Sequence, residues 1–163
     1  MKKLFIFLSL LGVCTLGFTQ KKSPYITKVF EYRPAPGQFI NEMPLYEKGD
    51  TKERMVQKVQ NCIQGDTKIL ISLGGYGGYL IFGFDHLVQN VEGKNDFKIW
   101  GNAFYAGTNP NSGASKEGGS CEPGIVWVAY DANGDGLPND TWYELAGSEY
   151  YKSETLKSYQ ITY

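Results

Sequence analysis

The stretch that decides the fold runs from Lys68 to Phe84 and reads KILISLGGYGGYLIFGF. Two apolar segments, 68–73 and 79–84, flank a glycine-rich hexapeptide at 73–78. β-branched and aromatic residues favour strands, and glycines are typical of the turns that join them. The stretch therefore predicts two strands around a tight β corner, where the glycines allow close backbone packing.

The same hexapeptide, LGGYGG, superficially resembles a phosphate-binding loop that follows a strand. A dinucleotide fingerprint needs a third glycine and a helix after the loop. Here Leu80 occupies the place of that glycine, and a strand is expected to follow. We therefore interpret the glycines as a packing feature.

Working outward, YITKVFEY at 25–32 predicts an earlier strand, which Pro34 and Pro36 end because proline removes a ladder donor. Four more strands are expected after the corner, most of them separated by glycine-rich turns, at 96–100, 125–130, 141–145 and 159–163. This pattern favours a sandwich or barrel over βαβ units. The sequence predicts a mostly β protein, an antiparallel β-sandwich of jelly-roll type with one short N-terminal helix.

The helix is expected to begin at Asp50, with Glu53 three residues later completing a capping box. One apolar face follows at helical spacing, and Gly65 ends the run. We expect this face to cover the core; its residues are Met55, Val59, Cys62 and Ile63.

The N-terminus has the pattern of a secretory signal peptide, with Met1-Lys2-Lys3 before an apolar run from Leu4 to Phe18. The run is shorter than the roughly 20 residues of a membrane span. We expect residues 1–19 to be removed, which leaves one β-sandwich domain at 20–163. The last expected strand stops at the final residue, so we expect a chain truncated at its C-terminus. Lipoprotein anchoring at Cys14 is an alternative that Val13 disfavours, since a lipobox requires a small residue there.

Charge and cysteine content narrow the class of protein. Lys plus Arg number 16 against 17 Asp plus Glu, a balance that excludes the basic face of a nucleic-acid-binding protein. Beyond the leader, Cys62 and Cys121 allow one disulfide in an oxidising compartment or two free thiols.

The sharpest chemical motif is DANGDG at 131–136. Oxygen-bearing side chains at positions one, three and five, followed by glycine at six, match the opening of a calcium loop. Trp142 stands at position twelve, where such loops place a bidentate Glu, so other oxygens must close the shell. The expected metal ligands are Asp131, Asn133, Asp135, the Leu137 carbonyl, Asn139, Asp140 and Glu144. The alternative is a β-hairpin turn, in which Asn, Asp and Gly are favoured for conformational reasons.

The sequence offers little for catalysis. His86 is the single histidine, no serine lies in a nucleophile elbow, and ligands at zinc spacing are missing. A pair of carboxylates can still hydrolyse a glycoside, and the available ones are Asp85, Asp96, Glu122 and Glu144.

Aromatic residues make up 15% of the chain, including 12 Tyr. Most are expected in strands and core, but exposed rings also grip sugars and other small ligands. The candidates that lie in or beside expected loops are Tyr76, Tyr79, Tyr105 and Trp142.

Several strings together resemble a family of exported cell-surface proteins of Gram-negative gut bacteria, often labelled only as cell-surface or PKD-domain-containing proteins. They are ISLGGYGGY at 71–79, GFD at 83–85, NDFKIWGNAF at 95–104, EPGIVWV at 122–128 and TWYEL at 141–145. The pattern is also similar to secreted jelly-roll modules of the galactose-binding type. The resemblance implies a binding role. It also implies that Asp96, Asn102 and Glu122 form either a polar cluster that serves as a second cation site or partners of buried backbone groups.

We therefore expect an exported binding module, at the cell surface or in the periplasm, stabilised by Ca²⁺ and capturing a glycan or other small ligand. The alternatives are a secreted carboxylate-dependent polysaccharide hydrolase and a structural accessory of an outer-membrane uptake system, with a receptor complex as its partner.

Overall fold

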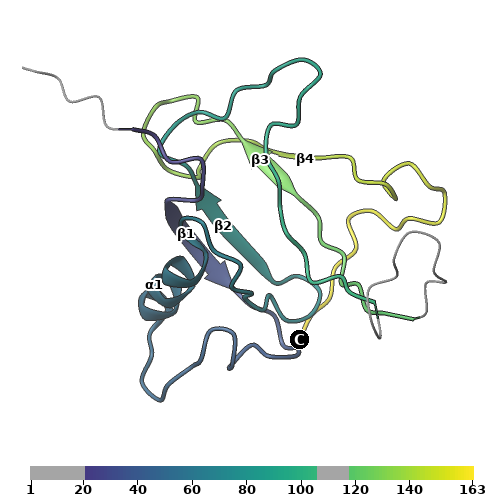
Figure 1. Cartoon of the computed structure of the whole chain (residues 1–163). Coiled ribbons are helices and arrows are strands. Elements are labelled where there is room, and N and C mark those ends of the chain that lie inside the picture. The colour runs from purple at the N-terminus through teal and green to yellow at the C-terminus, as the bar shows by residue number, and fades with distance from the viewer. Residues whose placement is uncertain (1–20, 106–117) are drawn as a thin grey trace, which may run out of the picture.

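The computed structural model describes residues 21–105 and 118–163, so the expected signal peptide and Cys14 lie outside the described residues. The described chain is mostly non-helical and has two small antiparallel sheets and one helix (Figure 1). This confirms the expectation of a mostly non-helical chain with antiparallel strands and one short helix, but the strands are fewer and shorter than the sequence predicted. The elements are β1 (Lys28–Arg33), α1 (Lys52–Ile63), β2 (Tyr79–Gly83), β3 (Trp127–Ala129) and β4 (Trp142–Glu144).

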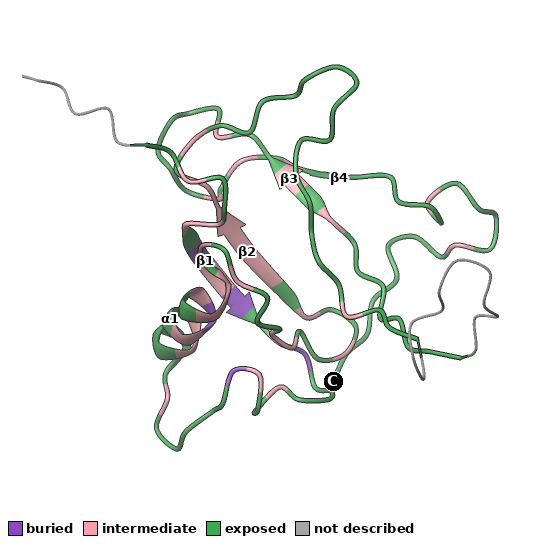
Figure 2. Ribbon diagram, viewed as in Figure 1, coloured by how far each residue is buried: buried purple, intermediate pink, exposed green. Residues whose placement is uncertain are grey.

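The first sheet pairs β1 with β2 and carries α1 on one side (Figure 1). The β1 register shifts between Val29 and Glu31, so β1 contains a one-residue irregularity. Strict alternation would place Val29 and Tyr32 on opposite faces, whereas a bulge shifts the alternation by one residue. Both side chains are buried in one cluster with Val59 of α1, which is fully buried (Figure 2).

Helix α1 is attached to β1 by polar as well as apolar contacts. Met55, Val56 and Ile63 pack around the buried cluster, which confirms most of the expected apolar face. The Gln60 Oε1 accepts the backbone N–H of Val29 at 2.9 Å. A buried backbone donor needs such a partner, so this bond fixes the helix against the irregular strand.

The start of α1 differs from the prediction. Thr51, not Asp50, is the N-cap, and its hydroxyl accepts the N–H of Arg54. Asp50 instead accepts the Glu47 N–H at 2.8 Å and the ammonium of Lys58 at 2.7 Å. The ion pair with Lys58 is a stronger, charge-assisted use of that carboxylate than a helix cap, which leaves the cap to the neighbouring hydroxyl.

The glycine-rich corner has the predicted close backbone packing, although only the second of its two expected flanking strands forms. A Cβ atom at Gly74 would overlap the carbonyl oxygen of Ala35, and one at Gly78 would lie 2.8 Å from the Ala35 nitrogen. A Cβ at Gly37 would likewise meet the backbone of Gly74 and Gly75. The two backbones can touch here because each of these contacts has a glycine on at least one side.

Three expected strands, at 68–73, 96–100 and 159–163, do not form. A strand needs a ladder of successive backbone pairs, and these segments make only scattered contacts. In the first of them, Ser72 donates its N–H to Met43 and Leu73 accepts from Ala35. The partner segment contains prolines and turns, so the hydrogen bonds cannot continue as a ladder.

No helix within 21–105 and 118–163 is long and apolar enough to cross a membrane.

The buried cluster of Val29, Tyr32 and Val59 leads to a prediction about stability. Val59→Ala removes two buried methyl groups, at about 0.8 kcal/mol each, and leaves a cavity, so the free energy of unfolding should fall by roughly 2 kcal/mol. Urea denaturation followed by circular dichroism measures the change. Val88→Ala, at an exposed position, is the matched control and should cost little. Equal losses for both variants would contradict the placement of the core.

The ion pair between Asp50 and Lys58 leads to a prediction about how stability depends on pH. The hydrogen bond from Lys58, together with the Glu47 N–H, holds the pKa of Asp50 below its ordinary value. A carboxyl with a lowered pKa stabilises the fold above its unfolded pKa of about 3.9, and this contribution is lost as the pH falls through the folded pKa. Asp50→Asn lacks that titration. The urea midpoint of the parent protein should therefore fall more steeply below about pH 4 than that of the variant; parallel curves would contradict the assignment.

Candidate functional site

The expected calcium motif lies in the loop of a β-hairpin. Strands β3 and β4 pair with Trp127 opposite Glu144 and Ala129 opposite Trp142. Residues 130–141 join them, so the motif at 131–136 forms the first part of the loop and residues 137–141 lead into the next strand. The two expected strands at 125–130 and 141–145 are confirmed in a shorter form. The hairpin therefore holds both ends of the loop close together.

The carboxylate of Asp131 accepts the backbone hydrogen bonds that shape the first half of the loop. Its Oδ1 accepts the N–H of Asp135 at 3.1 Å and its Oδ2 accepts the N–H of Gly136 at 3.0 Å. The backbone must turn sharply to aim both N–H groups at one carboxylate. Gly134 and Gly136 adopt φ angles of 71° and 70°, a conformation that glycine reaches without strain.

Asp135 gathers the second half. Its Oδ1 accepts the N–H of Leu137 at 2.8 Å, and its Oδ2 accepts the side-chain amides of Asn133 and Asn139, each at 2.9 Å. The amide of Asn139, followed by the Leu137 N–H, lowers the pKa of Asp135 from its ordinary value. The carboxylate is therefore ionised at neutral pH and held by three donors.

Asp140 is the residue that the loop does not satisfy. Its Oδ2 is buried and has no hydrogen-bond partner among the described residues. An unpaired buried acceptor costs roughly 1–3 kcal/mol, and more if it is charged. Such an atom calls for a partner outside the protein chain, such as a cation or a water molecule.

The structure brings some of the predicted metal ligands together and not others. Hydrogen bonds join Asp131, Asn133, Asp135 and Asn139. Glu144 lies in β4, opposite Trp127, and takes no part in these bonds. Across the described ranges, no three His, Cys, Asp or Glu side chains gather closely enough to hold a metal by themselves. A cation in this loop would need the amide and carbonyl oxygens as well.

One face of the hairpin is aromatic. Residues directly opposite in an antiparallel pair share a face, as do residues two apart in a strand. The register therefore places Trp127 and Trp142 on one face, together with Glu144. The Trp142 indole N–H lies 3.4 Å from the Pro138 carbonyl, so this face is tied to the loop.

Trp127 was not among the expected ligand-binding residues. It is half exposed, at 50% of its surface. The signal in the sequence was period-two alternation within 125–130, which separates Trp127 from the valines on either side of it. That alternation indicates a face but not whether the face is covered.

The three expected tyrosines lie apart from this hairpin face. Tyr76 is held by the C-terminal segment, because its hydroxyl donates to the Tyr159 carbonyl and its own carbonyl accepts from Tyr163. Tyr79 begins β2, opposite Arg33. Each is therefore part of a structural contact.

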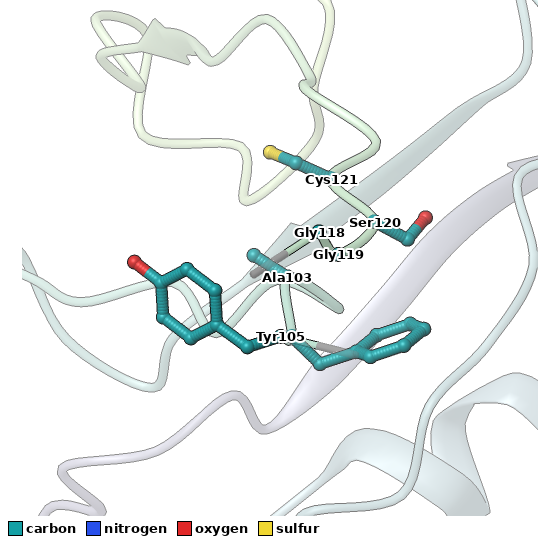
Figure 3. A pocket seen from close by; sticks show the side chains of 7 residues that line it. Ala103, Tyr105, Gly118, Gly119, Ser120 and Cys121 are labelled. Atoms are coloured by element: carbon teal, nitrogen blue, oxygen red, sulfur yellow. The ribbon is translucent and has the colours of Figure 1, made fainter. Parts of the chain in front are cut away.

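Tyr105 lines a separate hollow of about 460 Å³ (Figure 3). Two segments form its walls, and they meet through a backbone bridge between Phe104 and Ser120. The remaining lining residues are Ala103, Gly118, Gly119 and Cys121.

The polar cluster implied by the family resemblance is assembled in part. Asn102 donates its side-chain amide to Glu122 at 2.7 Å, across 20 residues of sequence. Asp96 instead accepts the N–H of Val91 at 3.2 Å. Asn102 and Glu122 thus form an exposed pair that does not include Asp96.

The structure also shows the state of the two cysteines and the contacts of Asp85. Cys62 and Cys121 are free thiols, the first half-buried on α1 and the second exposed. Asp85 is engaged by the Ser23 N–H and by His86, whose Nδ1 lies 2.7 Å from the carboxylate. These contacts attach the segment before β1 to the segment after β2.

No protein-family model matches the chain, and no curated protein matches its sequence. A function for the hairpin therefore rests on the residues described above.

Proposed function

We propose that the protein is an exported, calcium-stabilised binding module that captures a glycan or other small ligand at the cell surface or in the periplasm. The observation that carries this proposal is the hairpin loop, in which hydrogen bonds join four oxygen-bearing side chains and in which the buried Oδ2 of Asp140 has no partner among the described residues. Static capture, with no chemical step, is the role that this arrangement favours.

The donor set suits calcium. Ca²⁺ takes 6–8 oxygen ligands from carboxylates, amides and backbone carbonyls, in flexible geometry. The loop offers all three kinds within ten residues: the carboxylates of Asp131, Asp135 and Asp140, the amide oxygens of Asn133 and Asn139, and the carbonyl of Leu137. A bound cation would offset the negative charge that these carboxylates bring to the loop and could give Asp140 Oδ2 a partner.

The ligand surface that we propose is the aromatic face of the hairpin. Tryptophan rings bind the apolar face of a sugar, while a nearby carboxylate accepts its hydroxyl groups. Trp127 and Trp142 supply the rings and Glu144 the carboxylate. Because Trp142 is hydrogen-bonded to Pro138 in the loop, a cation that fixes the loop also fixes this face.

We extend the proposal to the finer fold, an antiparallel sandwich of jelly-roll type, as the resemblance to exported cell-surface proteins implies. The apolar residues on and beside β3 and β4 support it, because a solvated hairpin would not be expected to carry so many. Ile125, Tyr130 and Tyr143 are each more than 60% exposed. An outer-membrane receptor complex is the alternative partner for the same surface.

The calcium proposal is tested by thermal unfolding in calcium and in EDTA. A ligand that binds only the folded state at 100 times its Kd stabilises it by about 2.7 kcal/mol. For a domain of this size the melting temperature should rise by roughly 5–10 °C. The double variant Asp131→Ala, Asp135→Ala should lose this rise.

A matched control removes the same charge elsewhere. Glu92→Ala, Glu154→Ala changes two exposed carboxylates outside the loop and should keep the full calcium response. A parent protein whose melting is the same in calcium and in EDTA would reduce the loop to a hairpin turn. A loop variant that still responds would place the cation elsewhere.

The ligand proposal is tested by glycan binding. Trp127→Ala should weaken binding in a glycan-array or fluorescence titration by at least on the order of tenfold, since a stacked aromatic contributes about 1–3 kcal/mol. Trp100→Ala is the control, because Trp100 is exposed on a different segment beside Lys98. Equal effects of the two substitutions would reject the hairpin face as the binding surface, and released reducing ends would favour the hydrolase instead.

A further inference from the structure

The hairpin loop contains the one Asn-Gly dipeptide of the chain, Asn133-Gly134. In such a pair the backbone nitrogen of the glycine can attack the side-chain Cγ of the asparagine. A new bond between the glycine nitrogen and Cγ closes a five-membered succinimide. The Cγ–Nδ2 bond breaks, and Nδ2, protonated by solvent, leaves as ammonia. The attacking amide gives its proton to solvent base, and water then opens the ring to aspartate or isoaspartate.

The attacking nitrogen is accessible. Both residues are exposed, and nothing lies within 4 Å of the position that a Cβ on Gly134 would occupy. Among the described residues, the hydrogen bonds that hold the loop do not use the N–H of Gly134. The attack therefore breaks no hydrogen bond of the Gly134 N–H.

The carbonyl under attack is polarised by the loop itself. The Oδ1 of Asn133 accepts the N–H of Asp135 at 3.0 Å. Negative charge develops on this oxygen when Gly134 attacks Cγ, and a fixed donor at hydrogen-bond distance stabilises that charge. The other asparagine of the loop, Asn139, is followed by Asp140, whose side chain crowds the backbone nitrogen.

We propose that Asn133 is a site of spontaneous deamidation, and that the reaction changes the charge of the candidate cation loop. Aspartate at 133 adds a carboxylate next to Asp131 and Asp135. It also removes the amide that donates to Asp135 Oδ2 at 2.9 Å. Isoaspartate would instead lengthen the backbone within the turn.

The consequence for calcium rests on the proposed function. Calcium affinity in such loops is tuned by the number of charged ligands. A third carboxylate in this part of the loop destabilises it without a cation and strengthens its interaction with one. Ageing would therefore move the loop from a self-satisfied turn toward one that depends on calcium.

The deamidation is tested on the purified protein, kept folded in mildly alkaline buffer with EDTA and sampled over days. Tryptic peptides are analysed by mass spectrometry with fragmentation, and Asn133 and Asn139 fall in one peptide. Asn133 should lose its amide while Asn139 retains it. Asn133→Gln is the control, because ring closure from the longer side chain is slower. An Asn133 that stays intact when folded, over a time in which it converts in urea, would overturn the proposal.

The effect of the added charge is tested separately, by comparing the melting temperatures of Asn133→Asp and of the parent protein in EDTA and in calcium. The variant should melt lower than the parent in EDTA and gain more from calcium. Identical behaviour of variant and parent would overturn this consequence. If neither protein responds to calcium, the calcium site fails, while deamidation is still decided by mass alone.

Discussion

The irregularity in β1 is the constraint on which the first half of the structure depends. Because the register shifts between Val29 and Glu31, two side chains three residues apart face the same helix. Val59 then fits between them with no exposed surface. Without the extra residue, either Val29 or Tyr32 would face away, and α1 would lose one of the two buried β1 side chains that it packs against. The Gln60 side chain stabilises the same geometry through the Val29 N–H.

The two halves of the chain are stabilised by different kinds of interaction. The first is held by apolar burial: the buried residues Val29, Tyr32, Ala35 and Val59 all precede the glycine corner. The hairpin at 127–144 has no buried side chain and is held by backbone pairing and by side-chain oxygens that accept loop N–H groups. Such polar contacts contribute about 0.5–1.5 kcal/mol each, so the second half has more to gain from a bound cation.

Local patterns predicted the elements that local contacts form. The apolar face of α1, the close backbone packing at the glycines and the strands on both sides of DANGDG follow from periodicity and turn chemistry. The segments 68–73 and 159–163 have strand composition, yet they lack partners with which to build a ladder. The cap at Thr51 was missed because the competing use of Asp50 depends on Lys58, eight residues away. At the site, spacing predicted the converging oxygens, but the unpaired Asp140 oxygen and the face shared by Trp127 depend on three-dimensional placement.

The hydrogen bonds that the hydroxyls of Tyr76 and Tyr163 donate have a consequence for the order of folding. Each donates to a backbone carbonyl, across 83 and 87 residues respectively. Contacts of such separation form only after a long loop has closed, at an entropic cost that rises with the logarithm of its length. Structures rich in distant contacts fold slowly for this reason. The β3–β4 hairpin closes a far shorter segment, so its loop can assemble before the contacts between Tyr76 and the C-terminal segment have formed.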